Sequence, residues 1–421
     1  MSHPVASIWA ATAHPAPETP PIAGAHTADV AVIGAGVTGL GAAIKLAEGG
    51  ASVIVLDSGG PGFGASGRNG GQVIPGLKHD PDELDKLYGA AATEFAGKTA
   101  DVVFALIEKY GIDCAATRGG WIQGTLKTSH LPMLERRVAQ WKAHGADVEM
   151  LDAAGIRRLT GTGRYVGGWI DRRAGTLHPL NYSYGLARAA LSLGAQVHGG
   201  SEVASLKRSN GRWLLVTANG ARIDAGHVVI GTNGYTGRLW PKLKGTVIPA
   251  SSFQIATAPL SEEQLQRILP GSVAISDTRR IANYMRIGPG NRLMLGGRGT
   301  FSEPKELADY RRMVADLKAF FPETAGTPLD YYWSGRVAMT WDHMPRLHRP
   351  APDMTIALGY NGRGVALGTA MGQAIGAHIL DPQTPLPLTF RTIRPLPVHD
   401  LHPIYASMAI EYYRLRDSLE K

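Results

Sequence analysis

The sequence predicts an α/β or α+β fold organised around a largely parallel sheet that binds a nucleotide. Three observations predict it. Residues 29–57 have the pattern of a strand, a glycine-rich turn, a helix and a second strand, and helix-like and strand-like segments interleave along the rest of the chain. The length of 421 residues, 44% of them apolar and 19% charged, is typical of a globular protein with two domains.

The glycine turn of this unit reads Gly34-Ala-Gly-Val-Thr-Gly39, and Asp57 ends the second strand. Gly34 would make the tight turn, Gly36 would let the backbone approach a pyrophosphate, and Gly39 would let the helix pack closely on the strand. The helix N-terminus offers free N–H groups to the anion, and Asp57 can accept hydrogen bonds from ribose hydroxyls. A βαβ turn without a ligand is the alternative, but the flanking strands and helix favour a dinucleotide site.

Apolar periodicity and helix start and stop signals predict the other elements. Residues 1–27, rich in Pro, Ala and His, are expected to form an extended arm that Ile8 and Trp9 anchor to the body of the protein. His178 is expected to cap the helix that follows it, and Ser261 begins another helix with a capping box. Helices are predicted at 81–109, 130–144, 179–193, between Pro304 and Pro322, at 365–380 and at 403–418, and strands at 196–206, 212–218, 222–231, 292–297, 328–334 and 354–358.

A second glycine-rich segment distinguishes this chain from a simple dinucleotide-binding protein. Residues 59–76 contain eight glycines, where such a protein would normally continue into another helix. We expect this backbone to wrap closely around a second, larger part of the cofactor. Ser66, Arg68 and Asn69 offer polar atoms for contacts to it. A flexible surface loop is the alternative.

Four segments of the sequence occur together: Val32–Gly39 with Asp57, Gly64–Gln72, Val228–Gly234, and Trp333–Thr340 followed by Gly359–Leu367. The combination resembles the D-amino-acid-oxidase/glycine-oxidase (DAO) family of flavoproteins, and most closely its γ-glutamylputrescine oxidase-like branch. The resemblance implies a Rossmann-like FAD-binding domain built from discontinuous segments, and a smaller substrate domain with an antiparallel sheet. It assigns 28–110, 166–250 and 335–395 to the first domain, 111–165 and 251–334 to the second, and 396–421 to a C-terminal helix.

The resemblance also implies which residues hold FAD. They are Gly34, Gly36, Val37, Thr38, Gly39, Asp57, Ser58, Gly64, Ala65, Ser66, Arg68, Asn69, Gly70, Gly71, Gln72, Val203, Thr232, Asn233, Gly234, Arg336, Gly359, Asn361, Gly362, Arg363, Gly364 and Val365. Relatives that bind FAD covalently use a cysteine in the C-terminal half or a histidine in the first glycine loop. Here the only cysteine is Cys114, and Asn69 stands where the histidine would fall, so we expect non-covalent FAD.

The family reaction oxidises a C–N bond of a small-molecule amine or amino acid. A neutral amine passes a hydride equivalent to the flavin, and the resulting imine hydrolyses. Arg336 matches the arginine that pairs with the substrate carboxylate in relatives, and its planar guanidinium suits that group. A structural arginine is the alternative. The other candidate active-site residues, for which core packing is an alternative, are Tyr284, Arg286, Trp333 and Tyr360.

The electron acceptor is open at this stage. Reoxidation by O₂ would give H₂O₂, but relatives hold a lysine thought to assist this step on the strand equivalent to 292–297, and Met294 stands there. A dehydrogenase with another acceptor is therefore an alternative. A tRNA-modifying oxidase domain is a second one, motivated by the net charge of +8. Because the basic residues are scattered singly or in pairs, we expect no nucleic-acid partner.

Composition and motifs argue against several other classes. The sequence has neither a CxxC nor an HExxH signature, and we predict no metal site. It contains no window of about 18 apolar residues, so we predict no membrane span. It shows no secretory signal and cannot form an internal disulfide with one cysteine. These features together predict a cytoplasmic enzyme.

Overall fold

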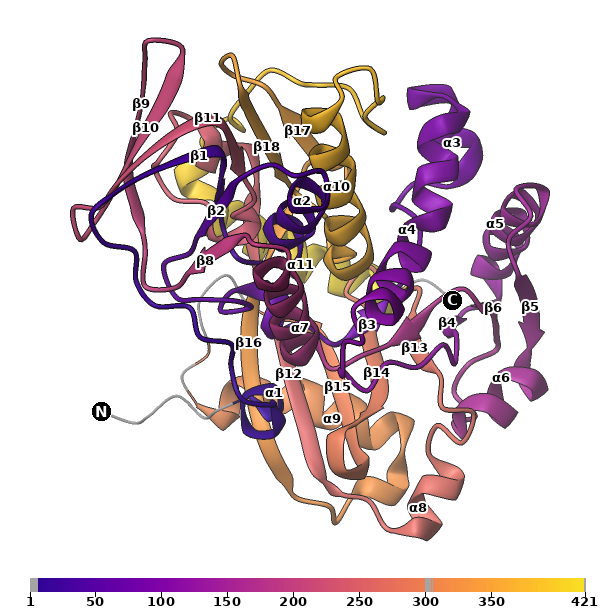
Figure 1. Cartoon of the computed structure of the whole chain (residues 1–421). Coiled ribbons are helices and arrows are strands. Elements are labelled where there is room, and N and C mark those ends of the chain that lie inside the picture. The colour runs from indigo at the N-terminus through magenta and orange to yellow at the C-terminus, as the bar shows by residue number, and fades with distance from the viewer. Residues whose placement is uncertain (1–6, 300–303, 305, 420–421) are drawn as a thin grey trace.

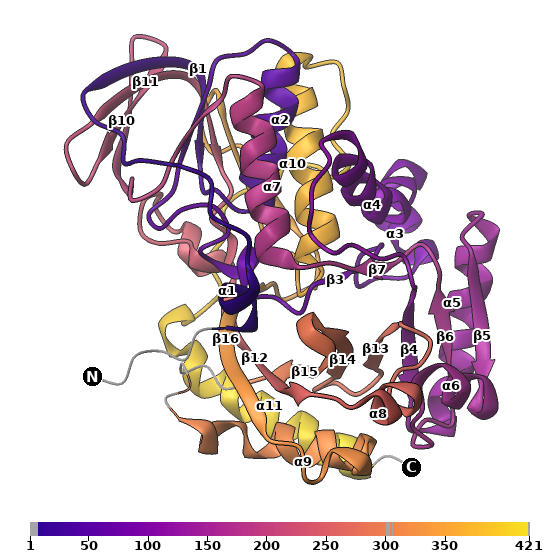
Figure 2. The same cartoon turned by 60° about the horizontal axis from the view of Figure 1, so that its bottom comes forward.

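Two large sheets form the framework of the protein (Figures 1 and 2). The computed structural model describes residues 7–299, 304 and 306–419. Within them lie two eight-stranded sheets and one two-stranded sheet of β3 (Gln72–Val73) and β7 (Gly175–Thr176). The mixed α/β class predicted from the sequence is confirmed.

The first sheet is mostly parallel and contains the predicted nucleotide-binding unit. β18, β11, β1, β2 and β8 lie side by side in that order and run parallel, while β17 pairs antiparallel with β18 at one edge. A hairpin of β9 and β10 pairs with β11 and carries part of the core of this sheet. The bounds are β1 Ala25–Ile33, β2 Val53–Leu56, β8 Gln196–His198, β9 Val203–Ser209, β10 Arg212–Thr217, β11 Arg222–Ile230, β17 Arg346–His348 and β18 Met354–Leu358.

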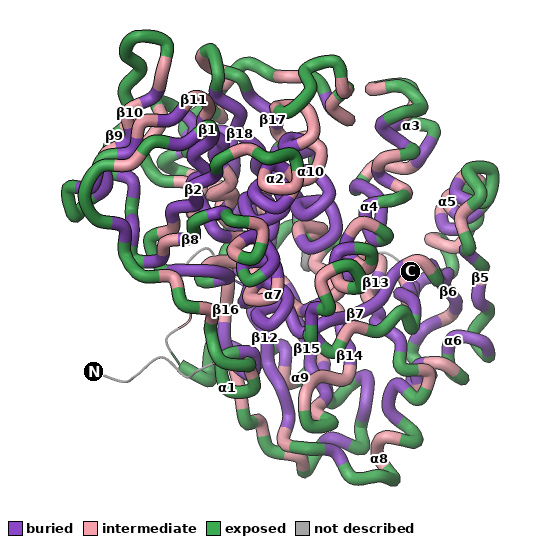
Figure 3. Tube along the Cα trace, viewed as in Figure 1, coloured by how far each residue is buried: buried purple, intermediate pink, exposed green. Residues whose placement is uncertain are grey.

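Three largely buried helices pack beside this sheet (Figures 1 and 3): α2 (Val37–Glu48), α7 (Pro179–Ser192) and α10 (Gly364–Leu380). The α2 helix lies between the other two, and small residues let it approach α10 closely. A Cβ atom at Gly372 would lie 2.2 Å from the Thr38 carbonyl oxygen, and one at Gly376 would lie 2.7 Å from the Lys45 Cβ. The two backbones are therefore in contact. His178 caps α7 as expected, because its Nδ1 accepts a hydrogen bond from the Asn181 N–H at 3.1 Å.

The second sheet has the strand order β16, β12, β15, β14, β13, β4, β6, β5. It is antiparallel except for the parallel pair β13 and β4. Helix α9 packs beside β15, and Figure 2 shows α9 and α11 together at this end of the molecule. The bounds are β4 Trp121–Thr125, β5 Val148–Asp152, β6 Gly167–Asp171, β12 Ile248–Pro259, β13 Ala274–Asp277, β14 Asn283–Gly288, β15 Arg292–Arg298 and β16 Leu329–Met339.

The remaining helices connect or cover the sheets. The N-terminal arm forms a one-turn helix whose Ile8 and Trp9 side chains are fully buried, which confirms the two predicted anchors. The bounds are α1 Ile8–Thr12, α3 Pro81–Tyr88, α4 Ala90–Lys109, α5 Leu131–Ala143, α6 Ala153–Thr160, α8 Glu262–Arg267, α9 Arg311–Phe320 and α11 His402–Leu419. Among these described helices, none is long and apolar enough to cross a membrane.

The structure corrects several predicted elements at glycines. The helix predicted at 81–109 is two helices, because Gly89 adopts a φ of +82° between α3 and α4. The strand predicted at 196–206 is also two, β8 and β9, separated at Gly199 and Gly200, where Gly200 has a φ of +57°. Both breaks occur at residues that tolerate the left-handed region.

Other corrections concern the segment before and within β16. The helix predicted from Pro304 begins only at Arg311, after a 3₁₀ turn at Leu307–Tyr310, and residue 305 lies outside the described residues. The strand predicted at 328–334 continues to Met339 and so crosses the proposed boundary at residue 335. β6, which the proposed ranges assign to the FAD-binding domain, pairs within the second sheet. The domain ranges therefore stay a prediction.

Candidate active site

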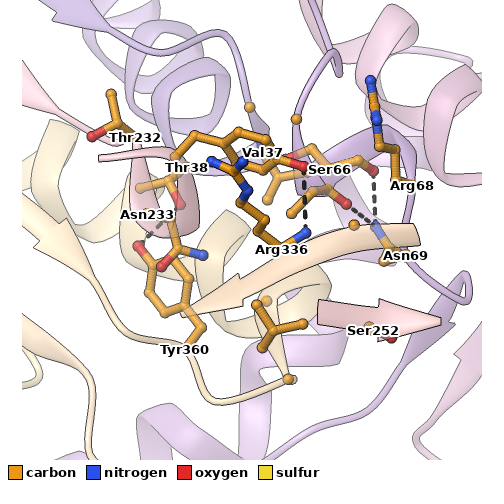
Figure 4. Close-up of a pocket in the computed structure, with 18 of the residues that line it drawn as sticks. Val37, Thr38, Ser66, Arg68, Asn69, Thr232, Asn233, Ser252, Arg336 and Tyr360 are labelled. Atoms are coloured by element: carbon orange, nitrogen blue, oxygen red, sulfur yellow. Dashed lines mark hydrogen bonds between the residues drawn. The ribbon is translucent and has the colours of Figure 1, made fainter. Parts of the chain in front are cut away.

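A cavity of about 820 Å³ lies where the two sheets meet. Its size falls in the upper part of the range of ligand pockets, about 300–1,000 Å³. Three segments far apart in the sequence line it: the turn before α2, the loop after β2, and the turn before α10. Figure 4 shows Val37, Thr38, Ser66 and Asn69 gathered beside Arg336 and Tyr360. The sequence predicted that these three segments converge.

The turn before α2 has the geometry of an anion-binding site. Gly34 has a φ of +109°, and a Cβ atom on Gly36 would lie 2.8 Å from the Ser66 Oγ. Ser66 Oγ accepts a hydrogen bond from the Val37 N–H at 3.1 Å, so its own hydroxyl hydrogen is free to point into the cavity. The N–H groups of the first helical turn and the helix dipole favour a negative charge here.

Asp57 is prepared to accept one more hydrogen bond. Its Oδ2 accepts from the Ala35 N–H at 2.8 Å, and its Oδ1 accepts from the N–H groups of Gly59 and Gly60, each at 2.8 Å. An ionised carboxylate has about four acceptor positions, so three backbone bonds leave one. This carboxylate lines the cavity at the end of β2, close to the start of β9 at Val203.

The turn before α10 is held by asparagine side chains. Asn361 has a φ of +53°, its Oδ1 accepts from the Thr340 N–H at 2.8 Å, and its Nδ2 donates to the Gly359 carbonyl at 2.6 Å. The Asn233 Oδ1 accepts from the Gly359 N–H at 2.8 Å. The start of α10 therefore faces the cavity on a fixed turn, and the Thr38 hydroxyl donates to the Tyr360 hydroxyl at 3.0 Å across it.

The loop after β2 is folded by Asn69 and supported by the N-terminal arm. The Asn69 Nδ2 donates to the carbonyls of Ala65 and Ser66, and its Oδ1 accepts from the Gly71 N–H. The Trp9 indole N–H donates to the Asn69 carbonyl at 2.8 Å. The Asn69 side chain is thus committed to shaping the loop, and Cys114, the only cysteine, is buried and is not among the cavity-lining residues.

The second sheet closes the opposite wall with polar side chains. Tyr284 on β14 packs so closely on β15 that a Cβ atom at Gly296 would lie 2.0 Å from its ring. The Tyr284 hydroxyl lies 2.5 Å from the Ser252 hydroxyl, and burial raises the pKa of Tyr284 to about 12. Gln72, Trp121 and Gln123 line the same wall. Tyr284 therefore stays protonated near neutral pH.

Arg336 on β16 lines the cavity, as expected for a residue that meets a ligand. Its guanidinium lies over the Tyr235 ring, with the Cζ atom 5.5 Å from the ring centre. The backbone N–H of Arg336 donates a hydrogen bond to the Tyr235 hydroxyl at 3.3 Å. The Tyr235 ring thereby holds the Arg336 guanidinium along the wall of the cavity.

The structure does not bring every predicted residue to the cavity. Arg286 is buried and donates to the carbonyls of Gly71 and Leu177, at 2.9 and 2.7 Å, so it braces the loop. The Trp333 indole donates to the Arg68 carbonyl at 2.9 Å and packs edge-on against Trp9. Four predicted glycines are also absent from the lining, namely Gly39, Gly71, Gly234 and Gly359. The other predicted residues line it.

Packing explains the position of Gly39. A Cβ atom there would lie 1.9 Å from the Gly34 carbonyl oxygen, so Gly39 serves helix packing, the role its place in the turn predicted. Sequence reasoning missed lining residues of the substrate wall, among them Lys78, Trp121, Gln123, Asp277, Arg280 and Arg298. They follow irregular loops or short strands without a recognisable motif. The Lys78 side chain is accessible to solvent inside the cavity, and the protein that encloses the cavity, together with the nearby charge of Arg363, lowers the pKa of Lys78 to about 7.

Comparison with known proteins adds to this geometry. A family model described as FAD dependent oxidoreductase matches residues 29–377. The probable oxidoreductase OrdL of Haemophilus influenzae is 33% identical over 94% of both chains, and the gamma-glutamylputrescine oxidoreductase of Escherichia coli is 31% identical over 100% of both. The structure of glycine oxidase from Geobacillus kaustophilus has a TM-score of 0.73 at 20% identity, covering 85% of this chain and 95% of that chain.

Proposed function

The chain belongs to the DAO family of FAD-dependent oxidoreductases, and on that premise we propose that it oxidises a C–N bond of an amine or amino acid. The family and the FAD cofactor predicted from the sequence are confirmed. The proposed products are an imine, which hydrolyses to a carbonyl compound, and H₂O₂. Similarity over the full length of a gamma-glutamylputrescine oxidoreductase supports an amine as the substrate.

The cavity fits FAD. Gly36 and Ser66 leave room for phosphates at the start of α2, where added side-chain atoms would clash. Asp57 and Val203 would hold the adenosine end, and the turn Gly362–Val365 at the start of α10 would meet the flavin end. The convergence of these three segments on one cavity is the observation that carries the proposal. Non-covalent attachment is supported by the commitment of Asn69 to its own loop.

Bound FAD supplies a two-electron acceptor for the hydride of the substrate carbon, so the protein needs mainly to orient the amine. Arg336 would bind a carboxylate of the substrate through its planar guanidinium. Tyr284, protonated at neutral pH, would donate a hydrogen bond to the substrate. Its ring would also exclude water from that wall of the cavity. None of these groups needs to act as a base, because the amine reacts in its neutral form.

For the electron acceptor we propose O₂. Met294, which stands where relatives hold a lysine thought to assist O₂ reduction, is buried in a cluster with Trp9, Trp333 and Ala256 and is not among the cavity-lining residues. A dehydrogenase with another acceptor remains the second candidate. The two differ in one product, H₂O₂.

The test is a screen of the FAD-loaded protein against polyamine conjugates, N-methyl amino acids, cyclic imino acids and simple amino acids. A peroxide-coupled assay and a dye-linked assay run in parallel on the same panel. We expect the yellow protein to bleach without O₂ when the correct amine is added, and to form H₂O₂ in air. Dye reduction without H₂O₂ would favour the dehydrogenase, and no turnover in either assay would reject amine oxidation.

A further inference from the structure

The C-terminal helix α11, which lies beside α9 in Figure 2, carries a continuous stripe of large apolar side chains on its outer face. At 3.6 residues per turn, the five that belong to α11 fall within one arc of about 80°. Leu401, in the turn before α11, extends the stripe. Each residue of the stripe is between 53% and 71% exposed. We call these six residues the α11 stripe: Leu401, Ile404, Met408, Tyr412, Leu415 and Leu419.

The opposite face of α11 holds the helix on the protein. Ala406 and Ile410, about half a turn away from the stripe, are buried. Asp417, on the same side, binds the loop after β13. Its carboxylate accepts hydrogen bonds from the backbone N–H groups of Arg280 and Ile281, at 3.0 and 3.3 Å. The α11 stripe is therefore a surface that is fixed to the body of the protein.

This orientation is the reverse of that of an ordinary surface helix, whose apolar stripe faces the core. At about 150–200 Å² for a large side chain, the exposed fractions correspond to roughly 600 Å² of apolar surface. The largest apolar patch of a typical monomer covers about 300–600 Å². Two such stripes in contact would bury roughly 1,200 Å², and flanking residues would add to this area. A stable protein interface buries about 1,200–2,000 Å².

The α11 stripe is complementary to itself. In an antiparallel pair of α11 helices centred near Tyr412, Ile404 of one copy lies opposite Leu419 of the other, and Met408 lies opposite Leu415. The positive end of each helix dipole then lies beside the negative end of the other. Among residues 402–419, none within the arc of the stripe is charged, so this contact buries no charge.

The charges that border the stripe fit a protein partner better than an anionic lipid surface. Glu411, which pairs with Arg312 of α9 at 3.4 Å, borders one side, and the exposed Arg416 borders the other. A helix that lies on an anionic membrane carries mainly Lys and Arg on its polar side. Charges of both signs around an apolar centre are instead typical of the polar rim of a protein interface.

We propose that the α11 stripe is the interface through which two copies of this chain associate as a twofold-symmetric dimer. The stripe lies outside the cavity, so this inference does not depend on the proposed function. It reaches the cavity through one contact. The Asp417 carboxylate also accepts a hydrogen bond at 3.0 Å from the guanidinium of Arg280, a cavity-lining residue, so a second copy bound to α11 would help to hold that wall in place.

Sedimentation equilibrium of the FAD-loaded full-length protein tests the association. We expect the mass of two chains at micromolar concentration, and we expect the dimer to persist at high salt because the stripe carries no charge. The double variant Ile404→Glu/Met408→Glu should raise the dissociation constant of the dimer roughly 100-fold or more, since each glutamate would be buried without a counter-charge. Ser407→Glu is the matched control, because Ser407 is exposed on α11 outside the stripe, and it should leave the protein dimeric.

A cross-link tests the antiparallel arrangement and does not depend on how a charged variant folds. Tyr412→Cys places one accessible thiol near the proposed twofold axis, since Cys114, the only natural cysteine, is buried. A short bismaleimide should convert most of this variant into cross-linked dimers. Ser407→Cys, on the same helix but away from the axis, should give little of this product.

Three results would overturn the inference: the mass of a single chain at every concentration, a dimer that Ile404→Glu/Met408→Glu leaves intact, or equal cross-linking of the two cysteine variants. Vesicles of phosphatidylcholine and phosphatidylglycerol provide the competing probe. A single-chain mass together with salt-sensitive binding to these vesicles would also overturn the dimer, and would assign the stripe to a lipid surface.

Discussion

At the scale of single residues, many polar side chains around the cavity hold backbone in place. Asn69, Asn233 and Asn361 each bind main-chain groups of the turns that line it. Because these side chains form hydrogen bonds to the main chain, the turns present their backbone N–H groups in fixed positions. The predicted or candidate residues for meeting a substrate carry charged or hydroxyl groups on the walls, among them Arg336, Tyr284 and Lys78.

Replacing Arg336 by glutamine should raise KM for an amino acid substrate roughly 10- to 100-fold and change kcat less. The reason is that a hydrogen bond between charged groups contributes about 1.5–3 kcal/mol to binding. Lysine at this position should recover part of the loss, because it keeps the charge without the planar fork. Steady-state kinetics measure this, with Arg158→Gln as the control at an exposed arginine of α6. An unchanged KM would assign Arg336 a structural role.

The buried His178 should make the protein less stable in acid. Burial lowers the pKa of His178 to about 4, and its Nδ1 must stay unprotonated to cap α7. The unfolded chain takes up this proton near pH 6.5, so stability is lost as pH falls from about 6.5 to 4.

By pH 5 the free energy of unfolding should have fallen by about 2 kcal/mol through protonation of this histidine in the unfolded chain. His178→Asn keeps a capping acceptor and removes the titration, so its free energy of unfolding should fall less between pH 7 and pH 5. Urea denaturation of both proteins at the two pH values measures the difference. Parallel losses in the two proteins would contradict the assignment.

The sequence allowed prediction of residues whose spacing is dictated by the cofactor, such as Gly34, Gly36 and Asp57. It could not locate Lys78 or Arg298, because tertiary folding alone brings a loop and a strand end to one wall. Trp333 stays a prediction for the active site: it shares a sheet face with Tyr284, but its indole donates to the Arg68 carbonyl and it is not among the cavity-lining residues. Arg286 also stays a prediction: it lies two residues from Tyr284, and the loop at Gly71 covers it.

At the scale of elements, the contact between α2 and α10 couples the two helices that begin at the cavity. Gly372→Ala should destabilise the protein by roughly 1–3 kcal/mol or more, because the new methyl group would lie 2.2 Å from the Thr38 carbonyl oxygen. Thermal unfolding measures the loss. Gly326→Ala is the control, since a Cβ atom there would meet nothing within 4 Å. A stability equal to that of the control would show that α2 and α10 can move apart to admit the methyl group without destabilising the protein.

The N-terminal arm is a second element with a defined task. Trp9→Ala should lower stability by roughly 3–5 kcal/mol and weaken FAD binding, because the indole packs in the core and holds the Asn69 carbonyl. Titration of the apoprotein with FAD and thermal unfolding measure the two effects. Trp341→Ala, at a side chain that is 79% exposed, should change neither. An unaltered FAD affinity in Trp9→Ala would show that the N-terminal arm does not help the loop after β2 to bind FAD.

At the scale of the whole molecule, both sheets contribute walls to one cavity, so a ligand there connects them. FAD at 100 times its dissociation constant should stabilise the protein by about 2.7 kcal/mol, provided that it does not bind the unfolded chain. Thermal unfolding with increasing FAD measures this rise. Riboflavin, which lacks the phosphates and adenosine, should stabilise less at the same concentration. A melting temperature independent of FAD would contradict binding between the sheets.

The two sheets also differ in how well the sequence predicts them. The first was recognisable because its parallel strands are buried apolar runs joined by helices with clear start and stop signals. The second was mostly invisible, because strands such as β12, with Pro249, Ser251 and Ser252 in it, lack regular alternation. Its order depends on pairing between distant segments: β4 pairs with β13, where Trp121 lies opposite Ala274, and β12 pairs with β16, where Gln254 lies opposite Trp333. Such long-range pairing leaves no local signal.

This division of the walls matters for anyone who wishes to redirect the enzyme. Saturation mutagenesis confined to Gln123, Ser276, Tyr284 and Arg298 would touch only strands of the second sheet. Such a library can be screened against new amines, while the glycine turns of the first sheet remain unchanged and continue to bind the cofactor. Chemistry and selectivity thus become separately adjustable parts of one catalyst.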